Sequence, residues 1–170
     1  MPLLTVVAGP NGSGKSTLTS SVSLAGVDIL INPDAIARRL NPEQPARAAI
    51  AAAREAILLC RAALSAKHTF VLETTLAGHC AMAVMRDARA AGYRTAIVYV
   101  ALGNPDLHME RVRLRVSRGG HDIPDGDIRR RYARSLHRAP DAISLADEGS
   151  CSRQFRSLPS PKAGDSVTGS

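Results

Sequence analysis

The sequence has few aromatic residues and no long run of apolar ones. It contains three Tyr, two Phe and no Trp among 170 residues. Proteins that bind single-stranded nucleic acid stack bases on aromatic side chains, so this scarcity argues against a nucleic-acid partner. The apolar runs are short, since AAIAAA at 48–53 ends at Arg54 and AIVYVAL covers only 96–102. A membrane-spanning helix needs about 20 apolar residues, and we therefore expect no contact with a membrane.

Cysteine and histidine are too few and too scattered to form a recognisable disulfide or metal site. Cys60, Cys80 and Cys151 include no CxxC pair, and the five histidines show no metal-ligand spacing. Reduced thiols in a cytoplasmic protein are the simple interpretation. The first residues, MPLLTVVAG, lack the basic and apolar segments of a secretory signal, which also favours a cytoplasmic location.

Acidic residues are outnumbered by basic ones, and the excess is unevenly placed. The chain has 22 Lys and Arg against 15 Asp and Glu, which gives a net charge of +7. Nine arginines and four acidic residues fall within 108–138, so +5 of that charge lies in 31 positions. Nineteen of the 22 basic residues are Arg, whose planar group binds two phosphate oxygens at once. An anionic ligand is therefore expected near this segment.

The order of predicted strands and helices indicates a single α/β domain. A chain of 170 residues that is 45% hydrophobic and 22% charged suits one domain. Apolar runs predict strands over 3–8, 28–31, 70–73 and 94–102. Helices are predicted over 15–23, 34–66 with breaks near two prolines, 81–91, 105–117 and 124–138. This alternation, with continuously apolar strands, indicates a three-layer fold with a mostly parallel central sheet and helices on both faces.

The composition changes near the end of the sequence. After about residue 147 Ser, Pro and Gly dominate, and no helical or strand periodicity is visible. Such segments cannot bury enough apolar surface to offset the entropy lost on folding. We therefore predict a domain over 1–147 and a disordered tail without a strand over 148–170.

Residues 9–16 form the most specific pattern, GPNGSGKS, which matches G-x-x-x-x-G-K-[ST] between a predicted strand and a predicted helix. Its glycines let backbone N–H groups surround phosphate oxygens, and the helix that follows points its N-terminus at the same anion. Lys15 would reach the terminal phosphates of ATP, and the Ser16 hydroxyl would ligate Mg²⁺. The pattern predicts the P-loop NTPase and kinase fold. The expected ATP-binding residues are Gly9, Pro10, Asn11, Gly12, Ser13, Gly14, Lys15, Ser16 and Thr17.

Two carboxylates follow predicted strands and should face this loop, since ligands lie beyond the carboxyl ends of parallel strands. Asp34 follows the second strand and suits a catalytic base, while Glu73 ends the third and suits a metal or substrate contact. The alternatives are structural: Asp34 as a helix N-cap, and Glu73 as a solvated residue at the end of its strand. Thr74 and Thr75 can bind a substrate hydroxyl or simply favour the strand.

Arg111, Arg115 and Arg118 are spaced to lie in one stripe on the helix predicted over 105–117. The residues 119–124, GGHDIP, follow as a short loop in which two glycines allow movement. Together they are typical of a lid that covers phosphate groups and stabilises a transferred phosphoryl group. A solvated basic helix is the alternative, and Asp127 is spaced to pair with Arg131.

The segments AGPNGSGKST, NPDAIA, LETTLAG and RVRLRVSRGGHDIPDGDIRRRYARS, taken in this order, resemble the zeta-toxin family of P-loop kinases. The resemblance covers residues 3 to about 147. It implies an enzyme that uses ATP and Mg²⁺ to phosphorylate a sugar hydroxyl of UDP-N-acetylglucosamine, and an antitoxin protein that blocks the nucleotide site.

Carried over position by position, Asp34 matches the catalytic base of the zeta-toxin family, and Lys15 with Ser16 matches its phosphate-binding pair. Glu73 and Thr75 match substrate-side contacts of the family. Apart from the resemblance, we also expect His121 of the loop to contact the substrate, and Glu73 is a second candidate ligand for Mg²⁺. Arginines within 111–118 match those that contact phosphate. Short members of the family continue into a last apolar strand, which is not visible after residue 147 here.

We therefore expect an ATP-dependent kinase that phosphorylates a small-molecule hydroxyl, with a UDP-N-acetyl-aminosugar as the acceptor that the resemblance implies. Two alternatives remain at this point. One is a kinase of another acceptor, such as a nucleoside, a different sugar or a nucleic-acid end. The other is an ATP-binding protein whose catalysis is impaired because the sheet lacks its last strand.

Overall fold

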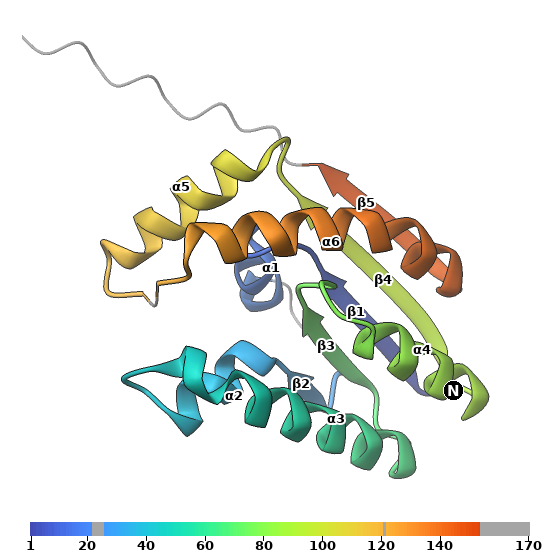
Figure 1. Ribbon diagram of the computed structural model, residues 1–170. Coiled ribbons are helices and arrows are strands. Elements are labelled where there is room, and N and C mark those ends of the chain that lie inside the picture. The colour runs from blue at the N-terminus through green and yellow to red at the C-terminus, as the bar shows by residue number, and fades with distance from the viewer. Residues whose placement is uncertain (22–25, 121, 154–170) are drawn as a thin grey trace, which may run out of the picture.

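The computed structural model describes residues 1–21, 26–120 and 122–153. Over these residues the chain forms a parallel sheet of five strands in the order β2-β3-β1-β4-β5 (Figure 1). The strands are β1 (Leu3–Ala8), β2 (Ile29–Ile31), β3 (Phe70–Thr74), β4 (Arg94–Ala101) and β5 (Glu148–Arg153). Because β1 is central, the loop that follows it leaves the middle of the carboxyl edge, where ligands of such sheets bind.

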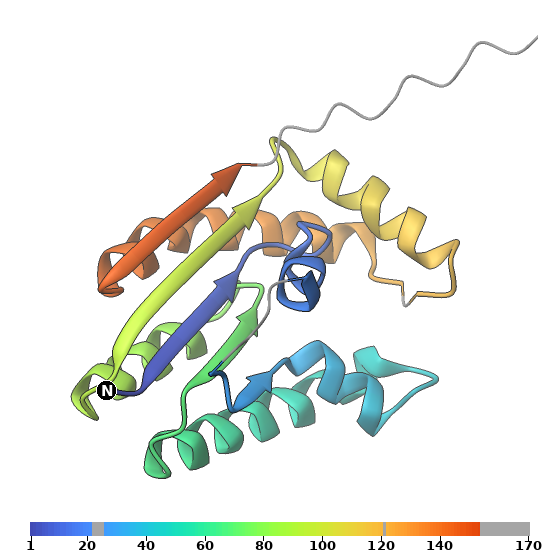
Figure 2. The ribbon, with the colours of Figure 1, turned by 180° about the vertical axis from the view of Figure 1, so that it is seen from behind.

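Helices lie on both faces of the sheet, as the sequence predicts. They are α1 (Lys15–Ser21), α2 (Pro33–Leu40), the short 3-10 helix η1 (Pro45–Ala48), α3 (Ala49–Ser65), α4 (Cys80–Ala90), α5 (Pro105–Val116) and α6 (Asp125–Leu145). Helices α3, α4 and α6 cover one face, while Figure 2 shows α1 against the other. Helices α2 and α5 stand beyond the carboxyl edge, on either side of the central strand (Figure 1).

The main core lies between the sheet and the three helices on one face. Leu4, Val6, Phe70 and Ile97 are buried on the strands, and small residues of α3 pack against them. The buried positions of α3 are Ala52, Ala56, Cys60, Ala63 and Leu64. Because most of these side chains are small, this helix can approach the sheet closely. No helix of the described residues is long and apolar enough to cross a membrane.

The prediction that no strand follows residue 147 is wrong for residues 148–153. These residues form β5, which pairs in parallel with β4 from Ala96↔Glu148 to Ala101↔Arg153. The strand escapes a search for apolar periodicity because its residues are mostly polar, and its pairing with β4 is made by backbone groups that any residue carries. Helix α6 is also longer than predicted and continues through Pro140 to Leu145. Residues 154–170 lie outside the described residues.

Candidate functional site

The loop between β1 and α1 requires glycine at two positions for steric reasons. Gly9 has φ +147, and a Cβ there would lie 1.9 Å from the carbonyl oxygen of Val100. Gly12 has φ +77, and its Cβ would lie 2.6 Å from the carbonyl oxygen of His108. Both φ values are ones that L side chains avoid. The loop therefore packs against β4 and α5 through its own backbone, in the strand–loop–helix context that the motif predicts.

Lys15 is buried at the start of α1, with 7% of its surface exposed. Its Nζ donates a hydrogen bond of 3.0 Å to the carbonyl oxygen of Pro10, so the side chain folds back over the loop. Burial lowers the pKa of the ammonium to about 8, although the carboxylates of Glu73 and Asp34 act in the opposite direction. Arg115 adds to the lowering. The ammonium is thus held in a buried position among charges of both signs.

Glu73 lies at the carboxyl end of β3 beside α1, and its carboxylate is directed at two hydroxyl groups. Ser16 Oγ donates to Glu73 Oε1 over 2.7 Å, and Thr19 Oγ1 donates to Glu73 Oε2 over 3.2 Å. The carboxylate is buried, with 5% exposure for the residue, so the alternative of a solvated strand-end residue is wrong. Adjacent β1 and β3 run parallel, which brings residues 57 positions apart to the same point of the edge.

The Ser16 hydroxyl and the Glu73 carboxylate fit a Mg²⁺ ion, which prefers oxygen ligands. The described residues contain no group of three or more His, Cys, Asp or Glu side chains that could hold a metal alone. In phosphate-binding sites, phosphate oxygens and water complete the coordination of Mg²⁺.

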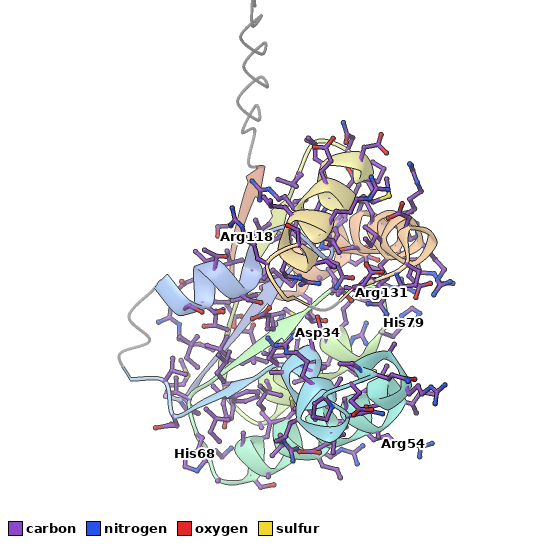
Figure 3. All side chains as sticks on the ribbon, turned by 90° about the vertical axis from the view of Figure 1, so that its left-hand side faces the viewer. Asp34, Arg54, His68, His79, Arg118 and Arg131 are labelled. Atoms are coloured by element: carbon purple, nitrogen blue, oxygen red, sulfur yellow. The ribbon has the colours of Figure 1, made fainter. Side chains whose placement is uncertain are left out.

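Asp34 lies in the first turn of α2, but it is not the residue that caps this helix. Asn32 is the N-cap, and its Oδ1 accepts hydrogen bonds from the backbone N–H groups of Asp34 and Ala35 at 2.9 and 3.1 Å. The alternative interpretation of Asp34 as an N-cap is therefore wrong. Its exposed carboxylate lines the space beyond the sheet, and Figure 3 shows Asp34 there, below Arg118 and Arg131.

Two adjoining cavities open at this edge. The first, which we call the loop cavity, has a volume of about 520 Å³ and is lined by Asn11, Gly12, Gly14, Lys15, Ser16 and Thr17, with residues of α5 above them. The second, which we call the side cavity, has about 310 Å³ and lies between α2, η1, α3, the end of β3 and α6. Lys15, Asp34, Glu73 and Arg115 line both. These four charged residues therefore stand where a group could pass from one cavity to the other.

The three arginines expected to contact phosphate all line the loop cavity, and Arg115 reaches the side cavity as well. Their neighbours on α5 and α6 are instead engaged with carboxylates. These ion pairs are Arg113 with Asp125, Arg129 with Asp106 at 2.7 Å, and Arg130 with Asp127 at 2.8 Å. The predicted pair of Asp127 with Arg131 does not form, since Arg131 donates to Asn11 Oδ1 at 3.2 Å. The stripe of Arg111, Arg115 and Arg118 thus faces the cavity, as its spacing predicts.

The remaining predicted site residues divide between the cavities and positions outside them. Thr74 and Thr75 both line the side cavity, and the Thr74 hydroxyl also accepts a hydrogen bond from the Leu76 backbone N–H at 3.1 Å. The Ser13 hydroxyl is buried and has no hydrogen-bond partner within the residues that the structure describes. Gly9 and Pro10 shape the loop without lining either cavity. His121 lies outside the described residues, while Asp122, Ile123 and Pro124 after it line the side cavity.

Two residues contact the loop although the sequence did not predict that they would. His108 of α5 is completely buried, and its Nδ1 lies 2.7 Å from the carbonyl oxygen of Asn11. Arg131 of α6 donates a hydrogen bond to the side chain of Asn11. These contacts join residues 97 and 120 positions apart, so no local pattern marks them.

Comparison with known proteins assigns the chain to a family. The model of a family described as an AAA domain matches residues 4–145. The chain belongs to this family. An uncharacterized protein of Haemophilus influenzae is 36% identical to this chain over 124 residues, or 73% of the chain and 88% of the relative.

Two solved structures show that this chain shares its fold with more distant proteins. One, from the PezAT chromosomal toxin–antitoxin system of Streptococcus pneumoniae, has a TM-score of 0.63 at 15% identity, over 92% of this chain and 70% of the other. Shikimate kinase from Acinetobacter baumannii has a TM-score of 0.55 at 18% identity, over 91% and 85%. The predicted three-layer fold of P-loop kinases is confirmed.

Proposed function

We propose that the protein is an ATP-dependent kinase that transfers the γ-phosphoryl group to a hydroxyl of a small molecule. The observation that carries this proposal is the pair of adjoining cavities that share Lys15, Asp34, Glu73 and Arg115. In this proposal the loop cavity binds the nucleotide phosphates and the side cavity binds the acceptor. A reaction between two bound substrates needs such an arrangement, because positioning supplies much of the rate enhancement.

The proposed step uses residues of both cavities. The acceptor hydroxyl oxygen bonds to the γ-phosphorus as the bond from that phosphorus to the bridging oxygen of ADP breaks. The hydroxyl proton passes to the carboxylate of Asp34, which later releases it to water. Lys15 holds the β- and γ-phosphate oxygens, and Arg111, Arg115 and Arg118 stabilise the charge on the transferred group. ADP and a phosphomonoester are the products.

Bound at Ser16 and Glu73, Mg²⁺ would supply positive charge next to the β- and γ-phosphates. The ammonium of Lys15 lies on the loop itself and provides a fixed charge at the same place. Its present partner, the Pro10 carbonyl, is a neutral acceptor that phosphate oxygens can replace.

The acceptor that we propose to test first is UDP-N-acetylglucosamine. Two observations support it: the ordered motifs that resemble the zeta-toxin family, and the likeness of the fold to a chain of a toxin–antitoxin system. An antitoxin as protein partner and a cytoplasmic location are part of this proposal. Other small hydroxyl compounds are the alternative acceptors, since shikimate kinase has the same fold. The charged and apolar walls of the side cavity, with Arg38, Asp122 and Ile123, suit a polar small molecule.

The test is a ³¹P NMR time course with protein, Mg·ATP and UDP-N-acetylglucosamine, run beside the variant Asp34→Asn. We expect a growing phosphomonoester signal with the native protein and turnover at least about 100-fold slower in the variant. Affinity for ATP, measured by titration calorimetry, should change little. Asp87→Asn is the matched control, because Asp87 is an exposed carboxylate of α4 that lines neither cavity.

Each other outcome redirects the proposal. ADP formed equally without acceptor would mean hydrolysis and a different substrate, to be sought among other small hydroxyl compounds. Turnover that persists in Asp34→Asn would reject Asp34 as the base. ATP binding without any ADP would favour a nucleotide-binding protein that lacks catalysis.

A further inference from the structure

His108 occupies a buried position between the phosphate-binding loop and the rest of the fold. It lies in α5, directly after the first turn that Asn104 caps, and none of its surface is exposed. Its two ring nitrogens have different partners. The backbone N–H of Leu102 donates to Nε2 over 3.1 Å, and Nδ1 lies 2.7 Å from the carbonyl oxygen of Asn11.

These partners fix the protonation of the imidazole ring. Because an amide N–H can only donate, Nε2 is an unprotonated acceptor, and the single ring proton is on Nδ1. The Nδ1–H group therefore donates to the Asn11 carbonyl. Burial lowers the pKa of His108, and the nearby charges of Lys15 and Arg111 act in the same direction, while the hydrogen bond to the Asn11 carbonyl acts in the opposite one. The neutral ring with its proton on Nδ1 is the form that this environment favours.

Asn11 is held from a second side, by Arg131 of α6. The guanidinium donates to Asn11 Oδ1 over 3.2 Å, while the ring of His108 packs edge-on against Tyr132, the next residue of α6, at 5.1 Å between centroids. The carbonyl of His108 leaves no room for a Cβ at Gly12. Two helices thus fix both the main chain and the side chain of one loop residue.

We infer that His108 is a positioning residue that keeps the phosphate-binding loop in its anion-binding form by donating a hydrogen bond to the Asn11 carbonyl. A carbonyl held by His108 stays turned away from the loop cavity, so that the N–H groups of the loop remain free to meet phosphate. Without this donor, the buried carbonyl would seek another partner and the loop would change its conformation. This inference rests on one part of the proposed function, namely that the loop binds ATP.

Two substitutions separate the bonds of the ring. In His108→Asn the side-chain N–H₂ group takes the place of Nδ1, so the bond to Asn11 is kept and the one to Leu102 is lost. In His108→Gln the amide oxygen takes the place of Nε2, so the bond to Leu102 is kept and the one to Asn11 is lost. Each variant loses one buried hydrogen bond, and we expect similar decreases in melting temperature.

The expected results differ between the two variants in properties of the loop. The dissociation constant for Mg·ATP, measured by titration calorimetry, should rise about tenfold or more in His108→Gln and less than about threefold in His108→Asn. Amide hydrogen exchange of residues 11–14 in the free protein should accelerate about tenfold in His108→Gln alone. Tyr132→Phe is the matched control, since it removes hydroxyl contacts to the carbonyls of Leu102 and Gly103 but keeps the ring against His108.

Several outcomes would overturn the inference. Equal losses of affinity in both variants, or none in either, would reduce His108 to a structural residue. Nitrogen-15 NMR that places the proton of His108 on Nε2 would contradict the assigned donor. If the native protein binds ATP without phosphoryl transfer, the proposed function fails while the role of His108 stands. If the native protein does not bind ATP at all, the role of His108 is tested by hydrogen exchange alone. Unchanged exchange of residues 11–14 in His108→Gln would then reject this role.

Discussion

The two cavities of the candidate site are built in different ways. The loop cavity is shaped by backbone that is buried and bonded on several sides, with Asn11 held by α5 and α6 and Lys15 by Pro10. The side cavity is shaped by side chains from separate helices, and the carboxylate of Asp34 is exposed there. A cradle of backbone N–H groups binds any nucleotide phosphate, whereas the choice of acceptor depends on side chains.

This difference explains why the loop cavity could be predicted from the sequence and the side cavity could not. Backbone that must adopt positive φ demands glycine at fixed positions, so the loop leaves a local pattern. The walls of the side cavity come from α2, η1, α3, β3 and α6, and these segments lie near one another only in the folded chain. Changes to the loop should therefore disturb both the fold and nucleotide binding. Changes to residues that line only the side cavity should affect acceptor binding alone.

The largest effect is expected from a side chain placed in the loop. Gly9→Ala would place its Cβ 1.9 Å from the Val100 carbonyl oxygen at a φ of +147, so β4 and the loop cannot both keep their positions. We expect a loss of roughly 3 kcal/mol or more in the free energy of unfolding, with loss of ATP binding. Denaturant unfolding and titration calorimetry would measure both.

Two other glycines serve as controls for the effect of Gly9→Ala on stability. Gly14 has φ +99, but the nearest atom to a Cβ there is 3.8 Å away, so Gly14→Ala should cost only the backbone strain, about 1 kcal/mol. Gly78 has open space around it, and Gly78→Ala should be nearly neutral. A neutral Gly9→Ala would show that the loop adapts, and would remove the contrast between the two cavities.

A smaller and more selective effect is expected in the side cavity. Ala53 of α3 lines this cavity and no part of the loop cavity, so Ala53→Leu would fill space that the acceptor needs. We expect the KM for the acceptor to rise about tenfold, with unchanged affinity for ATP, because leucine is a good helix former and leaves α3 intact. Steady-state kinetics would measure it.

Ala51→Leu is the control, since Ala51 is exposed on the same helix and lines neither cavity. A rise in the dissociation constant for ATP with Ala53→Leu would mean that the two cavities are coupled more closely than their shared residues require.

Much of the scaffold could be predicted from the sequence because its signals are local. The strand over 3–8 coincides with β1, and the spacing of Arg111, Arg115 and Arg118 correctly places them on one side of α5. Asp34 could be placed at the carboxyl edge by topology alone. The sequence could not show which residue caps α2, because Asn and Asp are both favoured at the N-cap position. Only the structure shows that Asn32 is the N-cap and that Asp34 is not.

The parts that could not be predicted depend on contacts between distant residues or on backbone bonding. The bond from His108 to Asn11 spans 97 positions, and a lone histidine carries no signal of its partner. The strand β5 has the sequence EGSCSR, which lacks the apolar pattern of a strand although it pairs with β4. Because β5 is present through Arg153, a missing last strand is no longer a reason to expect impaired catalysis.

The smallest effect is expected at the amino edge of the sheet, opposite the site. There the Thr95 hydroxyl donates to Asp147 Oδ2 over 2.9 Å, next to a bond of 2.8 Å from the Thr95 backbone N–H to the same oxygen. These bonds lower the pKa of Asp147 and fix the turn between α6 and β5. Thr95→Val keeps the shape and the backbone bond but removes the hydroxyl.

We expect Thr95→Val to lower the melting temperature by about 2–4 °C, and Thr95→Ser, which keeps the hydroxyl, to lower it less. Affinity for ATP and the KM for the acceptor should be those of the native protein, because Thr95 lies at the amino end of β4 and both cavities open at the carboxyl edge. A change in ATP affinity larger than about twofold would show that this edge influences the loop. The distinction between a scaffold edge and a functional edge would then fail.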